Sequence, residues 1–309
     1  MFLFWEENIS GAQITLIILR RAGLIMRQKI TVPVERIQIG LIPNIVYAQK
    51  PFWFGNSSRS LKLDLLKPRS EHPLPLIIWL CGGAWVMMEK SYHLPEMVHL
   101  AEKGFAVASV EYRTTNECTF PSQIEDVKDA IRFLRAHASE YNLDSRHFGI
   151  MGESAGGYLS ILAGTSGSTR IFDTGDYQEE SSAVQAVCDW YGPSDFFDFA
   201  KENDAYPASP EALLLGGAAP SVPEQATAAD PCSYLSPETP PFLILHGNND
   251  HTVPFRQSEI LYERLTANST PVEFYEIDGA EHADCHFVQP AIRKLILDFF
   301  TRYLKSGDI

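Results

Sequence analysis

Six short runs of apolar, β-prone residues alternate along this chain with stretches of helical periodicity, and this alternation limits the fold more than any other feature. The runs are 75–80, 106–112, 148–151, 184–188, 242–245 and 272–277. Their hydrophobicity is continuous rather than alternating, which is typical of strands buried on both faces. The pattern therefore predicts a mostly parallel sheet with helices on both faces.

Two ranges, 123–138 and 287–304, have the spacing of amphipathic helices. The apolar stripe of the first consists of Ile124, Val127, Ala130, Ile131 and Leu134. Ahead of the parallel series, three further runs at 34–39, 44–48 and 61–66 are typical of antiparallel strands. We expect these strands to extend one edge of the sheet.

The chain has no internal repeat and no low-complexity linker, so we expect a single domain over residues 1–309, with an N-terminal extension at 1–50. The stretch 192–241 departs from the strand–helix rhythm, because it is rich in proline and small residues and has only short helical patches. A connection this long is typical of a functional lid or an insertion. We interpret it as a small cap.

Composition excludes several classes of function. The 309 residues carry 25 basic and 39 acidic side chains, a formal charge of −14, so we expect no nucleic-acid partner. The five cysteines include no C-x-x-C pair, which favours free thiols in a reducing compartment. The longest apolar run, 14–19, is too short to span a bilayer, and the start is acidic where a signal peptide is positive. We therefore predict a cytoplasmic protein without membrane association.

The motif Gly152-Glu153-Ser154-Ala155-Gly156 follows a predicted strand and precedes a helical stretch. Between a strand and a helix, the G-x-S-x-G pattern indicates a sharp turn that lifts the serine hydroxyl above the sheet. The turn strains the backbone, and side chains two residues to either side of the serine would clash, which explains the glycines. The helix N-terminus faces the charge that develops on a substrate. We predict Ser154 as a nucleophile.

A serine nucleophile needs a histidine base and a carboxylate that orients the base. In this topology both come on loops after later strands, with the acid before the histidine. Asp250 follows the run 242–245, and His282 follows the run 272–277. We predict that Asp250 and His282 complete a triad with Ser154.

Other polar residues near these loops have simpler explanations. Asp278 and Glu281 share the loop of His282 and are expected to solvate it. His251 adjoins the predicted acid, and adjacent residues rarely face each other productively. His246 lies where a strand gives way to its loop, and we expect a structural role for it.

The segment 81–85, Cys-Gly-Gly-Ala-Trp, follows the first parallel strand. Its glycines would let backbone amides approach a tetrahedral intermediate closely. We assign the oxyanion-hole donors to Gly82 or Gly83 together with the amide of Ala155. Four aromatic residues near strand ends are predicted to line an apolar substrate pocket, with core packing as an equal alternative: Trp85, Tyr92, Trp190 and Tyr191.

Several ordered segments together resemble the α/β-hydrolase superfamily, most closely its carboxylesterase branch of acetyl and feruloyl esterases, related to hormone-sensitive-lipase-type enzymes. These segments are 81–85, 111–113, 121–127, 152–157, 246–254 and 279–282. The resemblance implies an α/β-hydrolase fold with an eight-stranded, mostly parallel sheet, helices on both faces and a small cap. It also implies a serine esterase without a metal or organic cofactor. Cys81 stands where this family usually has histidine, and a thiol cannot supply the hydrogen bonds with which imidazole stiffens the turn.

We therefore expect hydrolysis of a small-molecule carboxylic ester, of the acetyl or feruloyl type, for example on an acylated sugar, through an acyl-enzyme on Ser154. Two alternative functions stay open: an amidase or peptidase that uses the same triad, and a catalytically silent binding protein. A homodimer also stays open as the oligomeric state. Two further readings are disfavoured. Cys81 is disfavoured as the nucleophile because it lies outside the G-x-S-x-G turn. A metal site at 282–286 is disfavoured because it would need His282, which the predicted triad already uses.

Overall fold

The structure, a computed structural model, describes residues 6–9, 12–15, 29–33, 36–52, 54–202 and 208–305. These residues form two units that divide between Gln38 and Ile39, which corrects the expectation of one domain. The first unit holds a small antiparallel sheet in which the middle strand pairs with both others. Its strands are β1 (Glu6–Ile9), β2 (Ala12–Thr15) and β3 (Lys29–Thr31).

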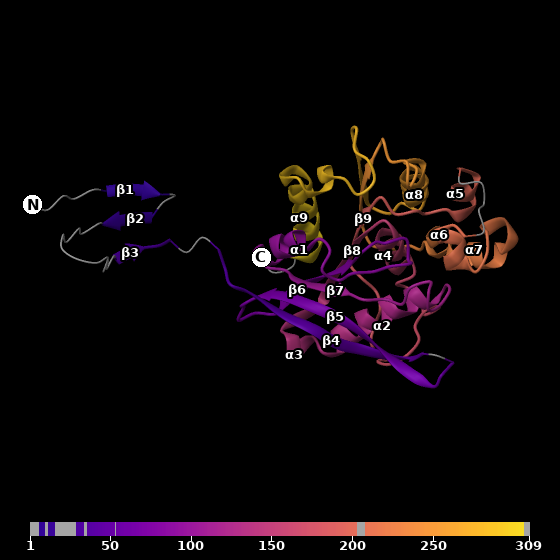
Figure 1. The fold of residues 1–309 in the computed structure, drawn as a ribbon, viewed down its shortest axis with the longest axis horizontal. Helices are drawn as coiled ribbons and strands as arrows, with labels where there is room; N and C mark the ends of the chain where they lie inside the picture. The colour runs from indigo at the N-terminus through magenta and orange to yellow at the C-terminus, as the bar shows by residue number, and fades with distance from the viewer. Residues whose placement is uncertain are drawn as a thin grey trace, which may run out of the picture. The chain divides into compact units, whose positions relative to one another are not determined.

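The second unit is built on an eight-stranded sheet of order β11-β10-β9-β8-β6-β7-β5-β4 (Figure 1). Strand β5 pairs antiparallel with β4 and β7, and the remaining neighbours pair in parallel. The predicted fold class, a mostly parallel eight-stranded sheet, is therefore confirmed. The strands are β4 (Ile39–Phe52), β5 (Ser57–Pro68), β6 (Leu74–Leu80), β7 (Ala106–Val110), β8 (Leu143–Glu153), β9 (Ala186–Trp190), β10 (Phe242–Gly247) and β11 (Val272–Ile277).

The antiparallel edge differs in detail from the sequence prediction. The runs 44–48 and 61–66 lie in β4 and β5 as expected. The run 34–39 contributes only Ile39 to a strand, since residues 36–38 are irregular and 34–35 lie outside the described residues. The expected extension at 1–50 also ends too late, because Ile39–Phe52 pairs with β5 as a full strand of the sheet.

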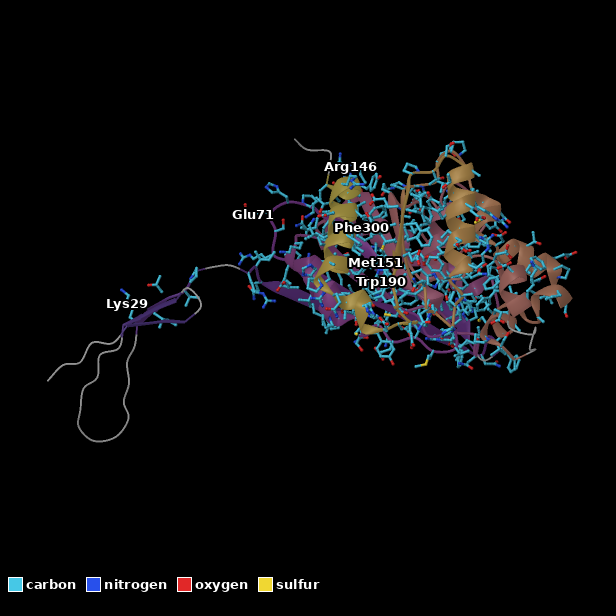
Figure 2. All side chains as sticks on the ribbon, turned by 90° about the horizontal axis from the view of Figure 1, so that it is seen from above. Lys29, Glu71, Arg146, Met151, Trp190 and Phe300 are labelled. Atoms are coloured by element: carbon cyan, nitrogen blue, oxygen red, sulfur yellow. The ribbon has the colours of Figure 1, made fainter. Side chains whose placement is uncertain are left out.

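Helices cover both faces of the sheet, and each face has its own hydrophobic core. Helices α1 (Leu94–Glu102) and α9 (Pro290–Leu304) pack on one face. Helices α2 (Ser122–Ala136), α3 (Ala138–Tyr141), α4 (Ala155–Thr165) and α8 (Arg256–Ala267) pack on the other. Figure 2 shows Met151, Trp190 and Phe300 among the dense side chains of the α1–α9 core. Because both faces are covered, neighbours along β8 enter opposite cores, which explains its continuous hydrophobicity.

Two of the motifs that carry the sequence resemblance are joined in space. Arg113, just after β7, donates through Nε and Nη2 to the two carboxylate oxygens of Asp126 on α2, both at 2.8 Å. The carboxylate also accepts from the Arg113 amide at 3.0 Å. A bidentate pair of this kind fixes orientation as well as distance. It therefore ties the chain that leaves β7 to α2.

The predicted cap segment folds as short helices between β9 and β10, beside α8 (Figure 1). They are α5 (Phe196–Glu202), α6 (Pro210–Leu215), η1 (Ala219–Ser221), α7 (Pro223–Ala229) and η2 (Pro231–Tyr234). A last short turn, η3 (Cys285–Val288), precedes α9. Within the described residues, no helix has both the length and the apolar character needed to cross a membrane.

Candidate active site

Ser154 occupies the turn between β8 and α4 with φ of 54°, a backbone conformation that is strained for any residue with a side chain. A Cβ atom on Gly156 would lie 2.0 Å from the Leu80 carbonyl oxygen. A Cβ atom on Gly152 would lie 2.4 Å from the Gly156 oxygen. The glycines on both sides of the serine are therefore required by space, as the motif predicted.

Three side chains from separate loops meet at this turn. Ser154 Oγ lies 3.0 Å from His282 Nε2, and His282 Nδ1 lies 2.6 Å from Asp250 Oδ2. Asp250 follows β10 and His282 follows β11, so the parallel pairing of these strands brings both loops to one edge. With the Nδ1 proton donated to the carboxylate, Nε2 is free to accept the proton of the serine hydroxyl.

The carboxylate of Asp250 is held by backbone and side-chain donors. Its Oδ1 accepts from the amides of Thr252 at 2.8 Å and Val253 at 2.9 Å. Its Oδ2 lies 3.2 Å from His246 Nε2, in addition to His282. Burial acts to raise the pKa of Asp250, but the hydrogen bonds from His246 and His282 outweigh it and hold the pKa well below its ordinary value. The group is therefore ionised at neutral pH and can stabilise an imidazolium.

His246 supports this carboxylate from the interior, in keeping with the structural role predicted for it. Its side chain is fully buried, with Nδ1 at 2.7 Å from Ser258 Oγ on α8 and Nε2 at 2.9 Å from the Val253 carbonyl. Nε2 must carry the proton to satisfy that carbonyl, so Nδ1 accepts from the serine. The acid loop is thereby connected to both β10 and α8.

The other polar residues of these loops have separate partners. Asp278 accepts from Asn248 Nδ2 at 3.1 Å, and Glu281 accepts from Asn249 Nδ2 at 3.3 Å. Both carboxylates are exposed, and so is His251. Neither carboxylate is the one that faces His282 Nδ1.

The expected oxyanion turn differs from the prediction at Gly82. Its amide donates to Glu153 Oε1 at 2.5 Å, so this amide does not point at the serine. Gly83 follows with φ of 126°, a conformation that favours glycine. Ala84 and Ala155 both line the space above Ser154, which makes the amides of Gly83, Ala84 and Ala155 the candidate donors. Sequence reasoning missed Ala84, although its position directly after two glycines was the available signal.

Cys81 heads the same turn and is fully buried. Its carbonyl accepts from the Tyr112 hydroxyl at 2.6 Å, which anchors the turn to the end of β7. Burial, followed by the charge of Glu153, raises the pKa of the Cys81 thiol to about 12. A thiol in this state is unreactive at neutral pH, which counts against Cys81 as a nucleophile.

Glu153 links the nucleophile turn to the oxyanion turn. The residue is 6% exposed, and burial raises its pKa to about 7, against the opposing effects of the Gly82 hydrogen bond and of His282. His93 Nε2 lies 3.7 Å from the same Oε1. Sequence reasoning gave no role to Glu153 or His93. For Glu153 the reason is that nothing in the G-x-S-x-G motif shows that the side chain at its second position turns inward.

A pocket of about 280 Å³ opens beside Ser154. The residues that line it come from both turns, the acid loop and the cap segment: Ala84, Trp85, Ser154, Ala155, Pro193, Phe199, Ser209, Pro210, Glu211, Thr252 and Val253. Among the four aromatic residues predicted for a pocket, Trp85 is in this set. Sequence reasoning did not identify Phe199 or Glu211, whose places depend on how the cap segment folds.

The other three aromatic residues do not line this pocket, and for Trp190 and Tyr191 the alternative of core packing holds. Trp190 is fully buried against Trp79, with ring centroids 5.6 Å apart, because the last residue of β9 enters the α1–α9 core. Tyr191 is also fully buried and packs edge-on against the His282 ring at 4.6 Å, so it supports the base and does not line the pocket. Tyr92 is 48% exposed and lies outside the pocket lining.

The described residues include one group whose donor atoms could hold a metal ion. Asp284, Cys285 and His286 have donors within 4.8 Å of one another. The Asp284 carboxylate already accepts from the amides of Glu281 and His286 and caps η3. His282, which the sequence placed near this group, instead contacts Asp250 and Ser154 through its two ring nitrogens.

The α/β-hydrolase class is defined by a serine on a strained strand-to-helix turn above a mostly parallel sheet. The acid and the histidine of this class lie on loops after later strands, as Asp250 and His282 do here. The BD-FAE family model matches residues 63–265, and the chain belongs to this family. The predicted superfamily is thereby confirmed.

Curated relatives are named as esterases. A probable carboxylic ester hydrolase LipM of Mycobacterium tuberculosis is 35% identical over 242 residues, covering 74% of this chain and 54% of the relative. The esterase LipQ of the same organism is 31% identical over 235 residues, covering 74% and 56%. The chain thus spans little more than half the length of these relatives.

Solved structures agree with the fold. A bifunctional GH43-CE protein of Bacteroides eggerthii superposes with a TM-score of 0.76 at 32% identity, covering 85% of this chain and 35% of that protein. A truncated carbohydrate esterase from gut microbiota superposes with a TM-score of 0.76 at 28% identity, covering 89% and 99%.

Proposed function

We propose that the protein is a serine esterase that hydrolyses short-acyl carboxylic esters through an acyl-enzyme. The observation that carries the proposal is the continuous hydrogen-bond relay from Ser154 Oγ through the His282 ring to the Asp250 carboxylate. The names of the relatives, carboxylic ester hydrolase and esterase, support the same reaction class.

Each step of acyl transfer has a group suited to it. Ser154 Oγ attacks the ester carbonyl while His282 Nε2 takes its proton, and Asp250 stabilises the imidazolium that forms. The amides that line the space above the serine bind the oxyanion. The imidazolium then protonates the leaving alcohol. A water molecule, deprotonated by the same nitrogen, attacks the acyl-enzyme, and collapse of the second intermediate releases the acid and restores Ser154.

The dimensions of the pocket favour small acyl groups. Ligand pockets are typically about 300–1,000 Å³, and this pocket, at about 280 Å³, lies just below that range. Apolar walls from Trp85, Phe199 and Val253 suit an acyl chain or an aryl group. Of the two ester types expected from the sequence, acetyl therefore fits more easily than feruloyl.

Turnover of p-nitrophenyl acetate by three proteins tests the proposal: the unchanged chain, Ser154→Ala and Ser57→Ala. Ser57 is an exposed serine at the start of β5 and provides the matched control. We expect Ser154→Ala to lose about 10⁴- to 10⁶-fold in kcat while it unfolds at an unchanged temperature, and Ser57→Ala to keep full activity. Full activity in a folded Ser154→Ala protein would overturn the proposal.

Two further measurements separate the alternatives. A fluorophosphonate probe should label Ser154 in the unchanged chain, and absence of the adduct would favour a catalytically silent binding protein. Matched p-nitroanilide amides and p-nitrophenyl esters of increasing chain length should show ester turnover far above amide turnover, with a maximum at short acyl groups.

A further inference from the structure

Glu211 is the one ionisable side chain among the residues that line the pocket beside Ser154. It lies on the first turn of α6, in the cap segment, and only 3% of its surface is exposed. Neighbouring wall residues are Phe199, Ser209 and Thr252. The site described above assigns no role to this carboxylate.

The orientation of α6 buries a charged side chain and exposes an apolar one. The helix buries Glu211 together with Ala212, Leu214 and Leu215, while Leu213 is 42% exposed. A rotation of the helix that exchanged the glutamate and the leucine would bury more apolar surface. The fold therefore holds Glu211 in the wall at an energetic cost, as is common for groups that contact a ligand.

The helix is fixed in this orientation by contacts at both ends. Ser209 caps its start, with the hydroxyl accepting from the Ala212 amide at 3.4 Å. The Leu214 carbonyl accepts from the Phe120 amide at 2.7 Å, and Gly216 ends the helix in the left-handed conformation with φ of 82°. Glu211 thus sits on a short but well-anchored element.

The carboxylate of Glu211 has no hydrogen-bond or ion-pair partner among the described side chains and amides. Buried carboxylates are normally paired or hydrogen-bonded, because an isolated one loses hydration without compensation. The Glu211 carboxylate lines the substrate pocket and has no donor within the described part of the protein, so we infer that its donor is a group on the substrate.

The surrounding wall indicates which donor this is. Ser209 and Thr252 line the same pocket and each carries a hydroxyl that can donate a hydrogen bond, while Trp85 and Phe199 offer apolar surface. A substrate hydroxyl both donates and accepts, so it can bind the carboxylate and a neighbouring hydroxyl together. An ammonium group could use the carboxylate but not these donors.

We propose that Glu211 determines substrate specificity by accepting a hydrogen bond from a hydroxyl group on the alcohol part of the ester, so that the preferred substrates are acylated polyols or sugars. This proposal rests on the esterase function proposed above. The carboxylate also repels esters that carry a second carboxylate near the scissile bond, which narrows the substrate class to neutral, hydroxylated alcohols.

The test compares Glu211→Leu, Glu211→Gln and Glu224→Gln with the unchanged chain. Glu224 is an exposed glutamate on α7 of the same segment, so its replacement is the matched change of charge. The quantity measured is kcat/KM for an acetylated methyl xyloside divided by kcat/KM for p-nitrophenyl acetate, which has no hydroxyl. We expect this ratio to fall about 10- to 100-fold in Glu211→Leu, less in Glu211→Gln, and not at all in Glu224→Gln.

A purely structural role for Glu211 predicts a different result. Removal of an unpaired buried charge should leave the unfolding temperature of Glu211→Leu unchanged or raised, whereas loss of a structural contact would lower it. A lowered unfolding temperature with an unchanged ratio would overturn the proposal. So would a selective loss of turnover on an acetylated amino alcohol, because that result identifies a cation site.

The failure of this proposal is distinguishable from failure of the esterase function. If the unchanged chain hydrolyses p-nitrophenyl acetate and is labelled at Ser154, while the ratio is the same in Glu211→Leu, only the role of Glu211 is wrong. If the unchanged chain does neither, the esterase function itself is wrong, and the role of Glu211 falls with it.

Discussion

The carboxylate of Glu153 accepts the amide proton of Gly82 at 2.5 Å, so the residue before the nucleophile is bound directly to the turn that precedes the oxyanion donors. The Glu153 carboxylate therefore couples the nucleophile turn to the oxyanion turn, since it belongs to the first and binds the second. The Cys81 carbonyl, anchored by Tyr112, closes the other side of the oxyanion turn.

Glu153 should make stability depend on pH. Its pKa is about 7 in the folded chain and 4.5 ordinarily, so the folded chain retains a proton that the unfolded chain releases between these values. The free energy of unfolding should therefore fall as pH rises from about 4.5 to 7, by about 3 kcal/mol from this group. Urea unfolding at several pH values should show a flatter profile for Glu153→Gln than for the unchanged chain. Equal slopes would contradict the prediction, and Glu224→Gln serves as the exposed control.

Asp250 should matter for rate far more than for substrate binding. Asp250→Asn replaces one acceptor oxygen by an NH₂ donor, which removes the charge that stabilises the imidazolium and can select the wrong tautomer of His282. We expect kcat for p-nitrophenyl acetate to fall about 10⁴-fold. Asp278→Asn, on the neighbouring loop, is the control and should leave kcat within about twofold. A small loss in Asp250→Asn would assign the orienting role to another group.

Cys81 should resist alkylation. It is fully buried with a pKa of about 12, whereas Cys285 is exposed on η3. Iodoacetamide at pH 7.5, followed by peptide mass spectrometry, should modify Cys285 first and leave Cys81 unmodified in the folded protein. The urea-unfolded chain should react at both positions. Rapid modification of Cys81 with parallel loss of esterase activity would restore it as a candidate nucleophile.

Gly82 should tolerate no side chain. A Cβ atom there would lie 2.3 Å from Glu153 Oε2 and 2.7 Å from the Glu153 carbonyl oxygen, whereas on Gly40 the nearest atom would be 3.9 Å away. We expect Gly82→Ala to displace the oxyanion turn and lower kcat about 10²-fold, with a loss of about 1–3 kcal/mol in stability. Gly40→Ala is the matched control. Similar kinetics for the two variants would show that the turn is not part of the site.

Strand and motif predictions succeeded where the signal was local. The apolar runs identified the parallel strands, since each strand is buried on both faces and its composition shows this directly. Gly152 and Gly156 could be predicted because the G-x-S-x-G pattern is itself local, although the atom closest to a Cβ on Gly156 is the carbonyl oxygen of Leu80, on another strand. The order of acid and histidine followed from the parallel strands that precede them.

Where a prediction depended on side-chain direction, the sequence left two alternatives and the structure chose between them. Trp190 and Tyr191 stand at the end of β9, and sequence alone does not say whether the end of a strand turns toward the pocket or the core. The first oxyanion donor was expected to be the amide of Gly82 or of Gly83, and the inward side chain of Glu153 takes the amide of Gly82. The boundary of the N-terminal unit was also misplaced, because the predicted run 44–48 is shorter than β4, which spans Ile39–Phe52 and pairs with β5 along its length.

The sequence by itself determined the fold class and which serine, histidine and carboxylate meet at one turn, because those depend on periodicity, on a local glycine pattern and on chain order. Only the tertiary structure decided that Glu153 takes the Gly82 amide, that His246 contacts Asp250, and that Glu211 of α6 lines the pocket. These arrangements come from contacts between residues far apart in the chain. Their energies depend on distance and direction in space, which a linear pattern does not encode.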